Sequence, residues 1–247
     1  MVLRLRTVTP LLPADTGVAD GLAYTLWLPP PPGPPARAGV VVLHGADSGK
    51  ESHHDFARAA VALGLGAVCF DQRGHGESAG ALGGGVLDDV ATVAARLRVA
   101  LGDPEAPVAV RGSSMGGYLA ILAAPVVRAG AVVAICPAGA EGLRRGLGDG
   151  RFGFAADTEA LAAFLDEHDL TQAARSLTVP LLLLHAEGDE RVPIAQSREL
   201  AEVLTVPESR LIAVPGGHHR SIQHDEELQA VSLRFILRAL GLARAAR

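Results

Sequence analysis

The chain has 247 residues, of which 49% are hydrophobic and 20% charged, so it can bury a large core and is too apolar to be disordered as a whole. The 22 basic and 27 acidic residues give a net charge of −5, and the basic residues are spread along the chain, which argues against a nucleic-acid partner. No segment has the length of a membrane span or the apolar core of a signal peptide. Cys69 and Cys136 lie in separate apolar runs, so we expect a cytoplasmic protein with two buried free thiols and no membrane partner.

Short apolar runs alternate with helical patterns along most of the chain, which predicts one α/β domain over residues 1–247. The runs are continuously apolar, as expected for a mostly parallel, doubly wound sheet covered by helices on both faces. Two strands are expected before the proline-rich segment 29–35, at residues 3–8 and 22–28. Later strands are expected at residues 39–45, 66–71, 106–112, 130–136, 179–186 and 209–216. Apolar helical faces are expected at Val86, Val90, Val93 and Leu97, and at Leu228, Val231, Phe235 and Ala239.

About forty residues, 138–178, interrupt this alternation. The first half of the segment is rich in Gly and Arg, and the second half places Leu161, Phe164 and Leu165 at helical spacing. Ligands bind beyond the carboxyl ends of the strands in an open parallel sheet, and a segment inserted after the strand that ends at Cys136 would cover that edge. We therefore expect residues 138–178 to form a short lid, with an ordinary crossover helix as the alternative.

The motif Gly112-Ser113-Ser114-Met115-Gly116 lies directly between an apolar strand and a helical run. In this setting the chain turns sharply after the strand and presents the hydroxyl of Ser114, while the flanking glycines leave room for the turn. Ser114 is therefore the candidate nucleophile. A serine hydroxyl needs a base, and the base needs an orienting acid; on such a sheet both come from later strand ends, in the order Ser, acid, His.

Two later strand ends supply these groups. The segment after the run 179–186 contains Asp189, with Glu187 and Glu190 as rival acids. The segment after the last expected strand, Pro-Gly-Gly-His-His, contains His218 and His219.

The ordered motifs resemble those of the α/β-hydrolase superfamily over essentially the whole chain, and in particular its small bacterial serine esterases and serine aminopeptidase-like hydrolases. The resemblance rests on His44-Gly45, on the segment 71–78 (DQRGHGES), and on the G-S-S-M-G, G-D-E-R-V-P and P-G-G-H-H motifs. It implies an α/β-hydrolase fold with a nucleophile elbow. It also implies a catalytic triad in which Asp189 is the acid and His219 the base, with His218 as the alternative base.

An oxyanion that forms when Ser114 attacks a carbonyl needs two pre-aimed hydrogen-bond donors. The residue after the nucleophile, Met115, would supply one backbone N–H, and the resemblance places the other on Ala46. Asp47, one position further, would bring a negative charge near this oxyanion hole unless its side chain points away.

The expected activity is that of a carboxylesterase acting on a small-molecule acyl substrate through an acyl-enzyme, without a cofactor. Alternatives are a thioesterase or a small-peptide hydrolase with the same triad, and, from another class, a noncatalytic protein that binds a small ligand. Aromatic residues of the segment 138–178 favour a modest apolar acyl or aryl group: Phe152, Phe154 and Phe164. Arginines of the same segment would suit an anionic substrate or form a solvated face: Arg144, Arg145 and Arg151.

The remaining histidines are expected to be structural or receive no role. His44 and His75 lie in turn motifs of the superfamily. His53-His54-Asp55 could suggest a metal site, but adjacent residues on a helix diverge by about 100°, so no metal is expected. No role is assigned to His168, His185 or His224, and the sequence leaves a homo-oligomer open.

Overall fold

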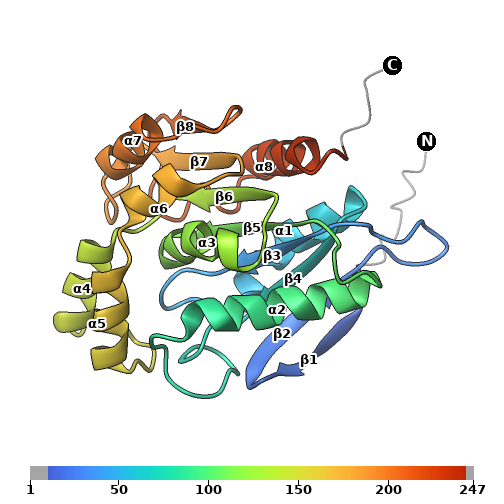
Figure 1. Cartoon of the computed structure of the whole chain (residues 1–247), viewed down its shortest axis with the longest axis horizontal. Coiled ribbons are helices and arrows are strands. Elements are labelled where there is room, and N and C mark those ends of the chain that lie inside the picture. Colours follow the sequence, from blue (N-terminus) through green and yellow to red (C-terminus); the bar gives the residue numbers. More distant parts are fainter. Residues whose placement is uncertain (1–10, 243–247) are drawn as a thin grey trace, which may run out of the picture.

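A computed structural model describes residues 11–242. Its centre is one eight-stranded sheet in the order β1-β2-β4-β3-β5-β6-β7-β8. The strands are β1 (Asp15–Ala19), β2 (Leu22–Trp27), β3 (Gly39–Leu43), β4 (Gly66–Phe70), β5 (Val108–Ser113), β6 (Ala131–Ile135), β7 (Leu181–Ala186) and β8 (Arg210–Val214). β2 pairs antiparallel with β1 and β4, and every other pair is parallel. The carboxyl ends of β3 to β8 therefore meet at one edge of the sheet (Figure 1).

Helices cover both faces of the sheet, as the apolar strands predicted. The elements are a short 3₁₀ turn (Lys50–His53), α1 (His54–Ala62), α2 (Val86–Leu101), α3 (Met115–Val126), α4 (Ala140–Gly148), α5 (Thr158–Glu167), α6 (Leu170–Ser176), α7 (Ile194–Glu202) and α8 (Glu226–Ala239). Alternate strand residues point to opposite faces. Val41 and Leu43 thus join the core beneath α2 and α3, while Val40 and Val42 join the core beneath α1 and α8.

The strand expected at residues 3–8 lies outside the described residues, and the structure adds a strand that the sequence analysis did not expect. β1 forms a hairpin with β2 through Asp20 and Gly21, which both have positive φ, 49° and 77°. An Asp-Gly pair is strongly favoured in such a two-residue turn. β1 was missed because its side chains alternate between exposed and half-buried rather than forming an apolar run.

The segment 138–178 contains α4, α5 and α6, and α4 and α5 project at one end of the sheet (Figure 1). Between α4 and α5 the chain returns to the body of the protein. There the N–H of Ala155 donates to the carbonyl of Gly74 (3.1 Å), and the N–H of Leu82 donates to the carbonyl of Ala155 (2.9 Å). Within residues 11–242, no helix is both long and apolar enough to cross a membrane.

Candidate active site

Ser114 lies in the sharp turn between β5 and α3, with φ 54° and ψ −119°, a backbone conformation that is strained for a residue with a side chain. The turn is fixed on both sides, because the N–H of Ser114 donates to the carbonyl of Ile135 (2.8 Å) and its carbonyl accepts from Ala138 (3.0 Å). A Cβ atom at Gly112 would overlap the backbone of Gly116. The glycines thus allow strand and helix to approach closely, and Ser114 stays half-buried at the carboxyl edge of the sheet.

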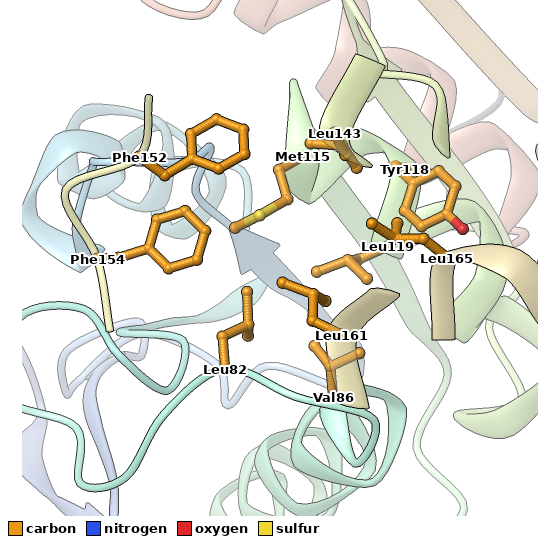
Figure 2. A pocket seen from close by; sticks show the side chains of 10 residues that line it. All are labelled: Leu82, Val86, Met115, Tyr118, Leu119, Leu143, Phe152, Phe154, Leu161 and Leu165. Atoms are coloured by element: carbon orange, nitrogen blue, oxygen red, sulfur yellow. The ribbon is translucent and has the colours of Figure 1, made fainter. Parts of the chain in front are cut away.

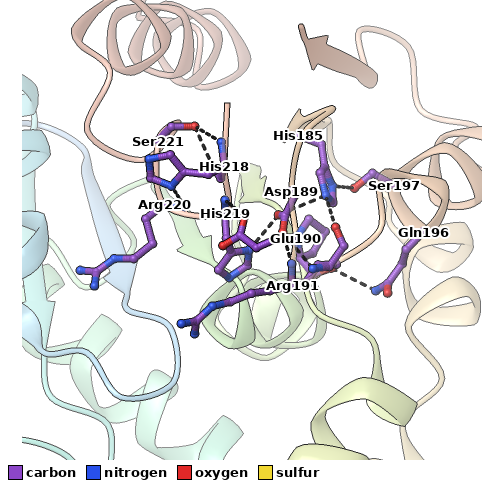
Figure 3. Close-up of polar contacts among 12 residues, drawn as sticks. His185, Asp189, Glu190, Arg191, Gln196, Ser197, His218, His219, Arg220 and Ser221 are labelled. Carbon is purple, nitrogen blue, oxygen red and sulfur yellow. Dashed lines mark hydrogen bonds and ion pairs between the residues drawn. The ribbon is translucent and has the colours of Figure 1, made fainter. Parts of the chain in front are cut away.

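Asp189 and His219 form a hydrogen-bonded pair at the same edge (Figure 3). The Nδ1 atom of His219 lies 2.7 Å from Oδ2 of Asp189, and the two side chains are 8% and 0% exposed. The other carboxylate oxygen accepts the backbone N–H groups of Arg191 (2.8 Å) and Val192 (2.9 Å). Burial alone would raise the pKa of Asp189, but hydrogen bonds from His185, His219 and these two N–H groups hold the pKa far below its usual value. The acid is therefore a fixed carboxylate.

The alternative acids and the alternative base lie elsewhere. The carboxylate of Glu190 accepts the backbone N–H of His219 (3.1 Å) rather than contacting its ring, and Glu187 pairs with Arg198 (3.1 Å). The ring of His218 is exposed, and its Nδ1 accepts the N–H of Arg220 (3.3 Å). Of the candidate residues, the structure therefore brings together Asp189 and His219, and it leaves His218 outside this pair.

Cys136, at the end of β6, faces the same pair. Its sulfur, a carboxylate oxygen of Asp189 and a ring nitrogen of His219 all lie within 4.8 Å of one another. Burial raises the pKa of the Cys136 thiol, so the thiol stays protonated and adds no negative charge beside the carboxylate. Both cysteines are free and buried.

The loop after β3 lies against the turn that holds Ser114. A Cβ atom at Gly45 would lie 3.2 Å from Cβ of Ser114, so the backbone at Gly45 is in close contact with Ser114. Ala46 is the next residue along the loop. Met115 is the first residue of α3, where a backbone N–H has no partner within the helix. Among the described residues, no acceptor is paired with the backbone N–H of Ala46 or Met115. Both groups are thus available as donors.

His44 and His75 hold this loop in place. Nδ1 of His44 donates to the carbonyl of Gly45 (2.7 Å), and Nε2 accepts the N–H of Gln72 (3.0 Å). Burial lowers the pKa of His44 to about 4, so the ring is neutral. Nε2 of His75 accepts the N–H of Asp47 (3.3 Å). Both histidines therefore have structural contacts.

The carboxylate of Asp47 points away from the loop and toward the segment 138–178. Its Oδ1 accepts the N–H of Gly153 at 2.6 Å. Next to this contact, the ring of Phe154 stacks on His75 with centroids 4.3 Å apart, and Phe152 stacks on Phe154 at 5.2 Å. The two aromatic rings are thus fixed to the loop that follows β3.

Lys50, the single lysine of the chain, also fixes this loop, and the sequence analysis did not single it out. Its buried ammonium lies 2.7 Å from carboxylate oxygens of both Asp71 and Glu77. Asp71 also accepts the backbone N–H groups of Lys50 (2.8 Å) and Glu77 (3.0 Å). The segment 71–78 is thereby held against the residues that follow Ala46. The rarity of lysine in the sequence was the one available signal.

An apolar pocket lies between the segment 138–178 and the helices α2 and α3 (Figure 2). The open space between its lining side chains is small, about 10 Å³, and one of these side chains is that of Met115, the residue after Ser114. Its lining residues are Leu82, Val86, Met115, Tyr118, Leu119, Leu143, Phe152, Phe154, Leu161 and Leu165. Phe164, also expected to face the site, instead stacks on His168 and lies against Tyr118.

The charged motifs outside the pocket are paired elsewhere. The three arginines of the segment form exposed ion pairs: Arg144 with Asp166, Arg145 with Glu141, and Arg151 with Asp149. In His53-His54-Asp55, the three side chains diverge. His53 lies beside Arg111, His54 packs on Trp27, and Asp55 binds His224.

Comparisons with known proteins agree with this architecture. Residues 34–149 match the family described as serine aminopeptidase, S33. A monoacylglycerol lipase of Mycolicibacterium smegmatis is 26% identical over 253 residues, which cover 83% of this chain and 88% of the relative. An esterase of Pyrococcus furiosus superposes with a TM-score of 0.71 at 23% identity, over 92% of each chain. Est1E of Butyrivibrio proteoclasticus, solved with ferulic acid bound, superposes with a TM-score of 0.67 at 21% identity, over 93% of this chain and 99% of that one.

Proposed function

Because this chain has the α/β-hydrolase fold, we propose that it is a carboxylesterase whose triad is Ser114, His219 and Asp189. The observation that carries the proposal is the 2.7 Å contact between His219 and Asp189, made at the same sheet edge as the strained turn at Ser114. Acyl transfer requires a base that is oriented by a carboxylate and that can reach a presented hydroxyl, and the three residues come from strand ends at one edge of the sheet.

In the proposed reaction the carboxylate of Asp189 accepts Nδ1–H of His219 and leaves Nε2 free to take the proton of the Ser114 hydroxyl. Oγ attacks the ester carbonyl, and the backbone N–H groups of Ala46 and Met115 stabilise the oxyanion. His219 then protonates the departing alcohol. Water, deprotonated by the same ring, releases the acid from the acyl-enzyme.

The apolar pocket supports an acyl or aryl group without charge as the bound part of the substrate. All ten lining residues are apolar or aromatic, and one of them is Met115, whose backbone N–H is a proposed oxyanion donor. We propose that the segment 138–178, which contributes half of this lining, acts as a short lid. The similarity to a monoacylglycerol lipase supports including a monoacylglycerol among the substrates tested.

The test compares the parent protein with Ser114→Ala on p-nitrophenyl esters of increasing acyl length, a monoacylglycerol, an acyl-CoA thioester and an amino-acid p-nitroanilide. Loss of the nucleophile should lower kcat on the order of 10⁴- to 10⁶-fold. Ser113→Ala, which removes the neighbouring hydroxyl of the same motif, is the matched control and should retain activity. Equal rates for Ser114→Ala and the parent would refute the mechanism.

The choice of substrates also distinguishes a carboxylesterase from the alternative functions. Preference for the thioester or the p-nitroanilide would identify a thioesterase or a peptide hydrolase with the same triad. A fluorophosphonate probe distinguishes a noncatalytic binding protein, because such a probe bonds to an activated serine. A folded protein whose Ser114 is not labelled would be a binder.

A further inference from the structure

A second imidazole, that of His185, contacts the same carboxylate of Asp189 as His219 does. His185 belongs to β7, four residues before Asp189, and its side chain is fully buried. Its Nε2 lies 3.4 Å from Oδ2 of Asp189, the same oxygen that His219 contacts, and 2.9 Å from the carbonyl oxygen of Val192 (Figure 3). Nothing in the proposed reaction uses this ring.

The hydrogen-bond partners of His185 fix its tautomer. A backbone carbonyl only accepts, so Nε2 carries the proton and donates it to the carbonyl of Val192, with Oδ2 of Asp189 lying 3.4 Å from the same nitrogen. The other nitrogen, Nδ1, lies 2.7 Å from Oγ of Ser197 on α7, which is also fully buried. A neutral ring that accepts the Ser197 hydroxyl proton satisfies all of these atoms without a buried charge.

The arrangement divides the two oxygens of Asp189 between different donors. Oδ1 is held by the backbone N–H groups of Arg191 and Val192. Oδ2 faces two imidazole rings, His219 at 2.7 Å and His185 at 3.4 Å. A donor that shares Oδ2 takes part of the negative charge that would otherwise stabilise protonated His219.

We propose that His185, oriented by Ser197, is a positioning residue that holds Oδ2 of Asp189 toward His219 and limits the basicity of that ring. This inference rests on the proposed function. It assigns His185 no contact with the substrate or with the reacting atoms. It concerns how strongly Asp189 supports the charge that His219 gains during the reaction.

Replacing His185 removes none of the other groups that face His219. The carboxylate of Glu190 faces the backbone N–H of His219, and the protonated thiol of Cys136 faces the pair from β6. Arg191, on the same loop as Asp189, and Arg220, next to His219, are exposed. A shift of the acidic limb of the pH profile in a His185 variant is therefore assigned to the loss of the His185 ring.

Removing the donor should have two measurable effects. In His185→Leu the carboxylate loses a contact that fixes it, and kcat should fall roughly ten- to hundredfold, because a displacement of about 1 Å can cost about 10²-fold in rate. Oδ2 should also interact more strongly with His219. The acidic limb of the kcat/KM pH profile should therefore move upward by on the order of half a pH unit. A general loss of structure would not raise this limb.

The experiment measures the pH dependence of kcat/KM for His185→Leu, His185→Gln and Ser197→Ala, with folding checked by circular dichroism. Gln keeps an N–H group close to the position of Nε2 and should restore the acidic limb of the parent. Ser197→Ala should shift the limb in the same direction as His185→Leu, by less. His53→Leu, the same change at a buried histidine on the opposite side of the sheet, is the control and should leave the limb in place.

The outcomes separate this inference from the proposed function. If the parent hydrolyses no ester and does not react with a fluorophosphonate, the proposed function fails. If the parent is active but His185→Leu and His185→Gln have the same acidic limb, His185 does not position Asp189. Should His185→Leu fail to fold, Ser197→Ala and His185→Gln decide alone: equal acidic limbs in these two variants and the parent would overturn the inference.

Discussion

The carboxylate of Asp47 accepts the backbone N–H of Gly153 at 2.6 Å and so connects the loop after β3 to the aromatic wall of the apolar pocket. Asp47 follows the proposed oxyanion donor Ala46 in the sequence. Gly153 is the residue between Phe152 and Phe154, whose rings stack on each other. The contact therefore links the proposed oxyanion site with the width of the pocket.

Replacing Asp47 by Ala should widen the range of acyl chains that the protein accepts. One hydrogen bond contributes about 0.5–1.5 kcal/mol, so its loss frees the aromatic wall only in part. We expect the kcat/KM ratio of p-nitrophenyl octanoate over acetate to rise roughly two- to fivefold, the equivalent of about 0.5–1 kcal/mol. Asp149→Ala, which removes an exposed carboxylate of the same segment, is the control. An unchanged ratio in Asp47→Ala would mean that this contact does not limit the pocket.

Replacing the two neighbouring histidines should have unequal effects. His219→Ala removes the ring that contacts Asp189, and kcat should fall on the order of 10⁴-fold or more. His218→Ala removes an exposed ring whose contact is the backbone N–H of Arg220, and kcat should stay within a few-fold of the parent. Steady-state kinetics with the best ester measures both. A severe loss in His218→Ala together with an active His219→Ala would reverse the assignment of the base.

Acid should destabilise the protein through His44 before most carboxylates titrate. The pKa of His44 is lowered to about 4 by burial, whereas in the unfolded chain it is about 6.5. Between these values the unfolded state binds a proton that the folded state does not. The free energy of unfolding therefore decreases as pH falls from 6.5 to 4, by up to about 3 kcal/mol from this residue, and loses nothing further from it below pH 4.

Urea unfolding at several pH values measures this effect. His44→Gln keeps an acceptor for the N–H of Gln72 and removes the titrating ring, so its stability should change less steeply between pH 6.5 and 4 than that of the parent. His218→Gln, the same change at an exposed ring, is the control for the substitution itself. Equal slopes in all three proteins would contradict this account of His44.

The sequence predicted the central strands because a parallel sheet covered on both faces requires uninterrupted apolar residues. Gly39–Leu43 and Leu181–Ala186 are fully buried and were recognised on that basis. β1 lies at the edge of the sheet and is half exposed, so its residues show no such run. The Asp20-Gly21 turn was the signal that could have predicted the hairpin.

The candidate site was predictable to the level of strand ends and no further. Parallel strands bring the segments after β5, β7 and β8 to one edge, which is why Ser114, Asp189 and a histidine could be assigned to one site. Which histidine ring faces Asp189 depends on the turn through Gly216 and Gly217, both at positive φ. The role of His185 depends on the register of α7, which brings Ser197 to the ring, and spacing along the chain does not show it.

The buried position of Lys50 has a consequence for covalent chemistry on the folded protein. Apart from Lys50, every residue counted as Lys or Arg in this chain is an arginine. The single ε-amino group lies among the carboxylates of Asp71, Glu77 and Glu51. Acylating and cross-linking reagents that require a free amine find no freely exposed lysine to modify. Acylation of Lys50 would therefore report the opening of the loop beside the proposed oxyanion site, and no other lysine would contribute to that signal.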